Sequence, residues 1–444
     1  MKLIHTGDLH IGKIVNEFSM LKDQADVLKK IVRIAVEEEA DGIIIAGDIY
    51  DRSVPPAEAV TLMDWFLTEL IKHGLKVFMI SGNHDSPERI AFASDIMDAQ
   101  GVYIAGTYEG SVKSVSLTEG DLSVNLYLLP FVKPQVVKYY EEILQDQNLV
   151  ELRENIEGNK NAKDKDDIET GEVEIEFGVE AELETESENE VKSEGNVQIK
   201  TFEDGVRCAL DKIELDPSAC NILVTHHFVT AGGQQPELSD SESGISLGGI
   251  DNVDVSVFDG FDYVALGHIH RAQRIGRDTI RYAGTPLKYS FSECQHKKSV
   301  TIVEIKPDKS IELRTRELVP LHDRRKIKGE LKDLMNPEYV KRADQEDYIQ
   351  ATLTDEVELV DPIGTLRSVY PNICQIILAK NLKETEMIAG DYQLQKRKNP
   401  MELFEEFFEK VTGRQMDEKR KSIVEEVISQ TMGGAEDETN QIRD

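Results

Sequence analysis

The segment Lys2-Leu-Ile-His-Thr-Gly-Asp-Leu-His10 places an aspartate and a histidine directly after a short apolar run. Such a run, ending at Gly and polar side chains, predicts a buried strand that stops at a turn. Four more apolar runs end in the same way, at residues 42–46, 76–80, 221–225 and 263–266. The motifs that follow them are Gly47-Asp48, Gly82-Asn83-His84-Asp85, His226-His227 and Gly267-His268-Ile-His270, so six of the ten histidines lie at predicted strand ends.

These motifs are expected to meet at one edge of an α/β structure. Residues 21–38 and 57–73 show apolar residues at helical spacing between the early strands. In open α/β sheets, ligands bind at the carboxyl ends of the strands. A mixture of carboxylate, carboxamide and imidazole groups suits manganese, iron or zinc, and paired metals of this kind hydrolyse phosphoesters. We therefore expect two divalent metal ions, with manganese favoured.

Each motif also has a purely structural explanation. Gly-Asp and Gly-Asn are common turn signals, and Asp85 is expected to cap a helix that begins near Pro87. His268 and His270 share a face because they are alternate residues on an extended segment. His226 and His227 are adjacent and face opposite ways, so only one of them should reach the metals.

The order D-x-H, G-D, G-N-H-D, H and G-H-x-H between residues 8 and 270 resembles the calcineurin-like metallophosphoesterase superfamily. Within it, segments 47–51, 266–271 and 284–290 resemble the SbcD family of nuclease subunits, as do segments 353–356 and 369–372. The resemblance implies a four-layer α/β/β/α sandwich over residues 1–315. It also implies a small α+β capping domain over residues 316–390 and a helical C-terminal tail over residues 391–444.

The resemblance further implies a role for each motif residue. One metal would be held by Asp8, His10 and His270, the other by Asn83, His226 and His268, and Asp48 would bridge them. His226 is favoured over His227 because it comes first after the apolar run. His84 would orient the scissile phosphate and protonate the leaving oxygen, and Asp51 would pair with His84.

By the same resemblance, the chain would be the nuclease subunit of an SbcCD-type complex. It would act as an ATP-dependent double-strand exonuclease and a single-strand or hairpin endonuclease in DNA repair, recombination and replication. Its partners would be an SMC-like ATPase of the SbcC type, double-stranded and hairpin DNA, and a second copy within a heterotetramer. The tail would contact the ATPase through Phe404, Phe407, Phe408 and Val411.

Two other functions use the same sequence features. A small-substrate phosphodiesterase or phosphatase would share every metal motif, and a non-enzymatic scaffold for the ATPase would have a vestigial site. The segment that resembles a capping domain and the apolar tail favour the nuclease, since an enzyme acting on small substrates needs neither. Retention of every expected ligand type and of His84 argues against the scaffold.

The formal charge of −33 is unusual for a protein that binds nucleic acid, because duplex binding rests on Lys and Arg. Residues 151–200 contain 17 acidic and 6 basic residues, a net −11, which leaves −22 for the rest. This segment is expected to be a disordered insertion, and shielding of the DNA cleft is one hypothesis for it. The clusters His296-Lys-Lys298 and His322-Asp-Arg-Arg-Lys326 would either engage the DNA backbone or form solvated faces.

The chain contains no apolar run near 20 residues, so no membrane span is expected. Its first residues lead directly into the first strand and Asp8, which leaves no room for a cleavable signal. A cytoplasmic location is therefore expected.

Overall fold

The computed structural model describes residues 1–144, 199–242, 251–357 and 359–379, together with Phe408, Met416, Arg420, Lys421 and Val424. Most of the insertion expected at 151–200 and of the tail expected at 391–444 lies outside the described residues, including Phe404, Phe407 and Val411. The chain divides into two compact units, Met1–Arg325 and Lys326–Asp444. Among the helices described, none is long and apolar enough to cross a membrane.

The first unit contains two six-stranded sheets. In the first sheet, β1, β4, β5 and β6 run parallel, and β15 and β16 continue it antiparallel beyond β1. Its strand order is β16 (Ile311–Glu317), β15 (Ser299–Ile305), β1 (Lys2–Thr6), β4 (Gly42–Ala46), β5 (Lys76–Ile80) and β6 (Val102–Ala105).

The second sheet joins strands from the middle of the chain. Parallel pairing connects β8, β9, β12 and β14, and antiparallel strands lie at both edges. The strand order is β13 (Gln273–Ile275), β14 (Arg277–Tyr282), β12 (Tyr263–Leu266), β9 (Cys220–Thr225), β8 (Leu122–Leu129) and β7 (Lys113–Glu119).

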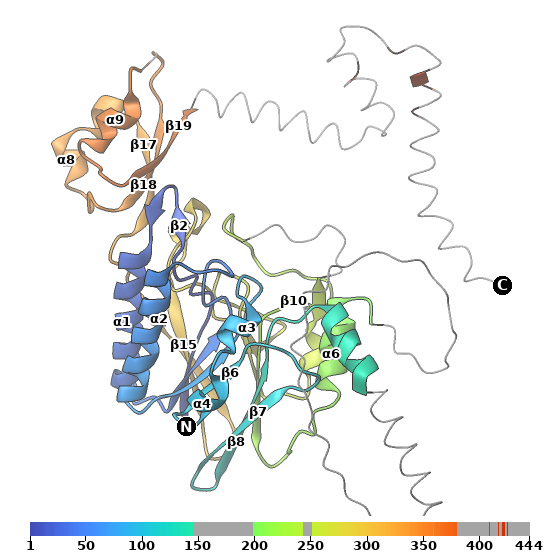
Figure 1. Cartoon of the computed structure of the whole chain (residues 1–444). Coiled ribbons are helices and arrows are strands. Elements are labelled where there is room, and N and C mark those ends of the chain that lie inside the picture. The colour runs from blue at the N-terminus through green and yellow to red at the C-terminus, as the bar shows by residue number, and fades with distance from the viewer. Residues whose placement is uncertain are drawn as a thin grey trace, which may run out of the picture. The chain divides into compact units, whose positions relative to one another are not determined.

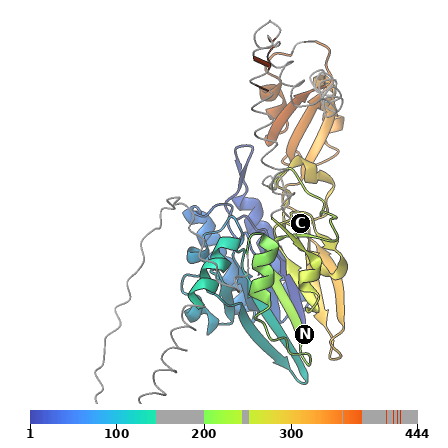
Figure 2. The same ribbon diagram turned by 90° about the vertical axis from the view of Figure 1, so that its right-hand side faces the viewer.

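Helices cover the outer faces of both sheets (Figures 1 and 2). The helices α1 (Leu21–Glu37) and α2 (Ala57–Lys72) lie against the first sheet, and α6 (Phe202–Leu210) packs against the second. Helix α1 buries an apolar stripe of Val27, Leu28, Ile31 and Ile34, because residues three and four apart share one face. Helix α6 begins at a capping box, in which Thr201 and Asp204 bind each other's backbone N–H.

The main core lies between the two sheets. Ile44 and Ala46 of the first sheet pack there with Val224 and Ala265 of the second, while Ile43 and Ile45 point to the opposite face. The expected four-layer α/β/β/α sandwich is therefore confirmed. The remaining elements of this unit are β2 (Ile14–Val15), β3 (Phe18–Ser19), α3 (Pro87–Ile90), α4 (Ser94–Asp98), β10 (Phe228–Thr230), β11 (Asn252–Asp254), η1 (Val255–Phe258) and η2 (Phe291–Gln295).

The second unit is a small α+β structure, whose strands are orange in Figure 2. Its sheet has the order β17 (Arg324–Gly329), β18 (Tyr348–Leu353) and β19 (Ile373–Leu378), and β17 begins at the unit boundary. The helices α7 (Leu331–Leu334), α8 (Pro337–Val340) and α9 (Pro362–Arg367) complete it. Ile349, Leu366 and Tyr370 are among the residues of its own core.

Candidate metal centre

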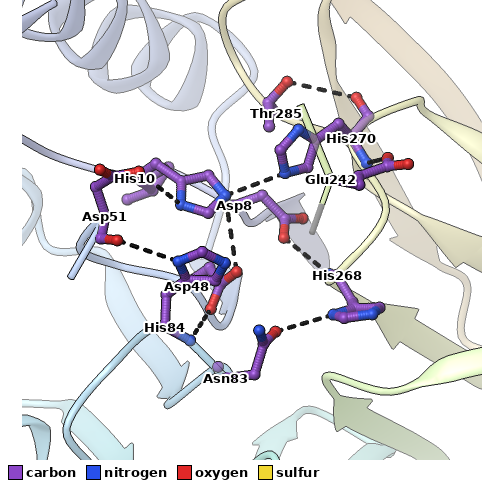
Figure 3. A network of polar contacts seen from close by, with 12 residues as sticks. Asp8, His10, Asp48, Asp51, Asn83, His84, Glu242, His268, His270 and Thr285 are labelled. Carbon is purple, nitrogen blue, oxygen red and sulfur yellow. Dashed lines mark hydrogen bonds and ion pairs between the residues drawn. The ribbon is translucent and has the colours of Figure 1, made fainter. Parts of the chain in front are cut away.

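The loops that follow β1 and β4 are bonded to each other, which brings their polar residues together (Figure 3). The backbone N–H of Asp8 donates to Gly47 at 3.0 Å, and that of His10 donates to Asp48 at 2.9 Å. The second sheet meets the first at the same edge, where His226 Nδ1 lies 2.8 Å from the carbonyl oxygen of Ala46. All the strand-end motifs singled out in the sequence therefore contribute to one cluster.

One group of donors consists of Asp8, His10 and His270, whose ligand atoms lie within 4.8 Å of one another. The Nε2 atoms of His10 and His270 face each other at 3.1 Å. Asp8 Oδ2 is fully buried and has no hydrogen-bond partner among the described residues. A buried acceptor without a partner and two converging imidazole nitrogens are the environment that a divalent cation would stabilise.

A second group consists of Asp8, Asp48 and His226, again within 4.8 Å of one another. His226 Nε2 lies 3.4 Å from Asp48 Oδ2 and 3.0 Å from Asn83 Oδ1. His268 Nδ1 lies 2.9 Å from the same oxygen of Asn83. Asp48 Oδ2 is also 3.7 Å from His10 Nε2, so this carboxylate lies between the two groups. The donor sets fit two adjacent metal ions.

His226 and His227 point in opposite directions, as adjacent residues at a strand end should. His227 Nδ1 contacts the Thr225 hydroxyl at 2.9 Å, and its ring stacks on Phe131 with centroids 5.4 Å apart. Both histidines are fully buried, but only His226 faces Asp48 and Asn83.

The side chains of the cluster pack so closely that two motif positions can be occupied only by glycine. A side chain at Gly47 would collide with the His226 ring, and one at Gly82 would collide with the Asp48 carboxylate. Asp8, Asp48 and His268 themselves adopt positive φ angles of 50°, 49° and 94°. Such backbone costs about 1–3 kcal/mol per residue and collects at functional sites, where surrounding contacts impose it.

Burial dominates the electrostatics of the cluster. It raises the pKa of Asp8 well above its usual range, and it lowers the pKa of His268 and His270 to about 3. Burial is the largest influence on Asp48 and would raise its pKa, but the charge of His226, its hydrogen bond to Asp48 and the nearby His10 and His84 together hold that pKa well below normal. His268 and His270 are therefore neutral near pH 7, the state in which imidazole binds metals.

His84 and Asp51 lie beside the cluster. The backbone N–H of His84 donates to Asp48 Oδ1 at 2.9 Å, and its ring Nδ1 lies 3.1 Å from the backbone oxygen of Asp51. The Asp51 carboxylate accepts from Lys13 Nζ at 2.5 Å and lies 3.7 Å from His10 Nδ1. His84 thus contacts the backbone carbonyl of Asp51, while the Asp51 carboxylate pairs with Lys13 and lies within 4.8 Å of a ring nitrogen of His10 and of His84.

The expected capping role of Asp85 is wrong. Helix α3 starts after Ser86 and has no side-chain cap. The Asp85 carboxylate instead accepts the backbone N–H groups of Ile49, Tyr50 and Gly82 at 3.0, 2.9 and 2.9 Å. Asp85 therefore joins the loops after β4 and β5, whose three backbone N–H groups satisfy its buried carboxylate.

Each basic cluster contains one buried residue, so neither is wholly a solvated face. Lys298 is only 5% exposed and pairs with Glu293, while Arg324 is 2% exposed and lies over the Phe291 ring.

Sequence reasoning also missed Ser241, Glu242 and Glu293, which surround His270. The motif Ser290-Phe-Ser-Glu293 shows a capping-box pattern, but nothing in it indicates a neighbour near residue 270.

Residues 1–272 match the model of the calcineurin-like phosphoesterase family. The chain therefore belongs to that family. Residues 320–412 match the SbcD C-terminal domain, described as the type 5 capsule protein repressor C-terminal domain.

Among individual relatives, the chain is 26% identical over 437 residues to the SbcD subunit of the SbcCD nuclease of Staphylococcus epidermidis. The match covers 97% of this chain and 98% of that protein. Among solved structures, a dimetal phosphatase from Danio rerio is matched with a TM-score of 0.35 and 14% identity, over 72% of this chain and 96% of the other.

Proposed function

We propose that the chain is the DNA-cleaving subunit of an SbcCD-type complex and hydrolyses phosphodiesters at a two-metal centre. The observation that carries the proposal is the pair of overlapping donor groups, Asp8–His10–His270 and Asp8–Asp48–His226, at one edge of the sandwich. The near full-length similarity to the SbcD subunit of an SbcCD nuclease supports DNA as the substrate.

In this proposal, Asp8, His10 and His270 would hold one ion, Asn83, His226 and His268 would hold the other, and Asp48 would be shared by both. Manganese is the proposed metal, because the set mixes imidazole with oxygen donors. When bound, two such ions would supply an activated water and positive charge beside the phosphodiester and its leaving oxygen. The chain's own residues fix the donors in place through the loop bonds between Asp8 and Gly47 and between His10 and Asp48.

His84 is the proposed proton donor to the leaving sugar oxygen. The backbone oxygen of Asp51, 3.1 Å from Nδ1, can only accept, so Nδ1 carries a hydrogen. Any proton that His84 transfers therefore moves through Nε2. Asp51 has a positioning role in this scheme: its carbonyl orients His84, and its carboxylate, held by Lys13, faces His10.

The openness of the site suits a polymer. Asn83 is exposed, His84 and His268 are half-buried, and the cavity between Asp48, Glu242 and His270 holds only about 10 Å³. Pockets that enclose small ligands are generally about 300–1,000 Å³. A strand laid across the surface could reach such a site without being enclosed by it.

The proposed partners follow from the relative. The protein would act with an SbcC-type SMC-like ATPase on double-stranded and hairpin DNA, as a homodimer within a heterotetramer in the cytoplasm. Exonuclease and endonuclease action in DNA repair, recombination and replication belong to the same proposal. The ATPase would supply much of the basic surface that a chain of formal charge −33 lacks.

One observation favours the alternative of a small-substrate phosphodiesterase. A cavity of about 370 Å³ borders the site through Gly82 and Asn83, and its lining includes Phe131, Tyr108 and Tyr140. Its volume is that of a small-ligand pocket. The two functions therefore have to be separated by substrate.

The decisive experiment compares release of nucleotides from linear duplex DNA with cleavage of a chromogenic phosphodiester, in manganese, with and without the ATPase. Asp48→Ala should abolish both activities, whereas Asp121→Ala, a change in the exposed turn between β7 and β8, should leave them unchanged. Cleavage of the small ester alone, even with the ATPase present, would reject the nuclease and support the alternative.

A further inference from the structure

The ring of His270 is held from the side opposite the metal centre by Ser241. Ser241 Oγ lies 2.7 Å from His270 Nδ1 and 2.6 Å from Glu293 Oε1. The adjacent Glu242 accepts the backbone N–H of His270 at 2.6 Å, so two consecutive residues contact the same histidine (Figure 3 shows Glu242 and His270). Ser241 and Glu293 belong to no motif that the sequence singled out.

The protonation state of Glu293 follows from its partners. Lys298 Nζ contacts Glu293 Oε2 at 2.5 Å, Thr285 Oγ1 at 2.6 Å and the carbonyl oxygen of His270 at 2.9 Å. These three acceptors match the three hydrogens of an ammonium group. Glu293 Oε1 also accepts from the backbone N–H of Ser290 at 3.0 Å. Glu293 is therefore a carboxylate, which can only accept hydrogen bonds.

The hydrogen count then determines the direction of every bond at Ser241. A hydroxyl has one hydrogen and two lone pairs, and the hydrogen must go to Glu293 because a carboxylate cannot donate. The contacts of Ser241 Oγ with His270 Nδ1 and with Ser239 Oγ, at 2.7 and 3.0 Å, must therefore be accepted. His270 Nδ1 carries the ring hydrogen, and Nε2 is left with a lone pair.

That lone pair points into the metal centre. His270 Nε2 lies 3.1 Å from His10 Nε2, where an ion shared by the two rings would lie. His226 is oriented by a simpler route, because its Nδ1 lies 2.8 Å from the Ala46 carbonyl oxygen, which can only accept. Metal-binding histidines are commonly fixed in this way by a partner on the second ring nitrogen.

We infer that Ser241, oriented by Glu293, is a positioning residue that fixes His270 in the tautomer protonated at Nδ1 and thereby presents Nε2 as a ready metal ligand. The inference rests on the proposed metal centre and on no property of the DNA substrate. The Ser241 hydroxyl thus links a buried Glu293–Lys298 pair to one ligand of the centre.

The test combines two measurements on the full chain. Nitrogen-15 spectra of the metal-free protein report which ring nitrogen of His270 is protonated, with the signal assigned by its loss in His270→Gln. Titration with manganese alone reports the number and affinity of bound ions. Ser241→Ala should mix the His270 tautomers and weaken one of two manganese sites about 10- to 100-fold, the range typical of such supporting residues.

Two further variants separate positioning from a general effect on folding. Ser241→Thr keeps the hydroxyl and should restore both readouts, whereas Ser239→Ala removes a neighbouring hydroxyl that does not touch His270 and should change neither. If Ser241→Ala keeps a single Nδ1-protonated tautomer and binds manganese as the unmodified protein does, the inference is overturned. If the unmodified protein binds no manganese pair, the proposed metal centre fails instead.

Discussion

The Nε2 atoms of His10 and His270 lie 3.1 Å apart although 260 residues separate them in the chain. His10 follows the first strand of one sheet, and His270 follows β12 of the other. Their approach shows that the candidate centre is built across the contact between two sheets, so it exists only when both sheets are folded and packed. Metal binding should therefore report on the packing of the whole sandwich as well as on the ligands.

The two adjacent histidines after β9 should have separable roles. His226→Ala should weaken manganese binding by more than the roughly 10- to 100-fold typical of supporting residues, because it removes a donor beside Asp48. His227→Ala should keep manganese affinity but lower the free energy of unfolding by about 1–3 kcal/mol, because the buried Thr225 hydroxyl loses a partner. Manganese titration and urea unfolding of both variants measure this. Equal loss of metal binding in both would contradict the assignment.

Asp85 should stabilise the protein by joining the loops after β4 and β5, and not by capping α3. Asp85→Ala leaves the backbone N–H groups of Ile49, Tyr50 and Gly82 without their acceptor, which should cost at least about 2 kcal/mol in the free energy of unfolding. Urea unfolding measures the loss. Ser86→Ala, at the residue that precedes α3, is the matched control and should stay within about 0.5 kcal/mol. A loss for Asp85→Ala no larger than that for Ser86→Ala would contradict the role of Asp85 in joining the loops.

The buried His5 should make the metal-free protein less stable in acid. His5 lies between the sheets with Nδ1 2.9 Å from the Tyr263 hydroxyl, and burial lowers its pKa from 6.5 to about 3. The unfolded chain binds a proton at His5 near pH 6.5, whereas the folded protein does so only near pH 3. The stability that is present above pH 6.5 is therefore lost progressively as the pH falls toward 3. Each such histidine contributes up to about 1.4 kcal/mol per pH unit.

The measurement is urea unfolding at several pH values in chelator, for the unmodified protein and for His5→Gln. Between pH 6 and 4, the free energy of unfolding of the variant should fall less steeply with decreasing pH, by up to about 1.4 kcal/mol per pH unit, the contribution of one histidine. His73→Gln, at the exposed end of α2, is the control and should leave the slope unchanged. Identical slopes for the unmodified protein and His5→Gln would mean that the imidazole is not kept neutral by the fold.

Lys298 should act on stability rather than as a contact to the DNA backbone. Lys298→Met leaves Glu293 as a buried charge without its partner, which should cost about 3–5 kcal/mol. The double variant Glu293→Met, Lys298→Met should recover most of that loss, because both charges are then absent. Thermal unfolding measures this, and Lys72→Met, in the exposed pair with Glu69, serves as control. Full stability of Lys298→Met with a lowered DNA affinity would support the surface role instead.

Local sequence signals were sufficient for the elements that build the site. The apolar runs of β1, β4, β5 and β12 end where the sequence predicts, and the helical spacing at residues 21–38 and 57–73 corresponds to α1 and α2 within one residue. These predictions succeed because a strand buried on both faces and an amphipathic helix depend on periodicity and on the turn residues beside them. The resemblance supplied the four-layer order, which local periodicity alone could not specify.

The sequence by itself determined which residue types stand at the strand ends, and therefore the kind of chemistry available: carboxylates, an amide and imidazoles suited to divalent metals. Only the tertiary structure decided that Asp85 bonds the loop after β4, that Lys298 is buried against Glu293, and that Ser241 orients His270. The Asp85 and Ser241 contacts join residues 35 and 29 positions apart, and the Lys298–Glu293 pair, only 5 positions apart, is buried because the surrounding elements pack over it. Because the two sheets must first pack before their edges meet, no local pattern of residues records which side chains will become partners there.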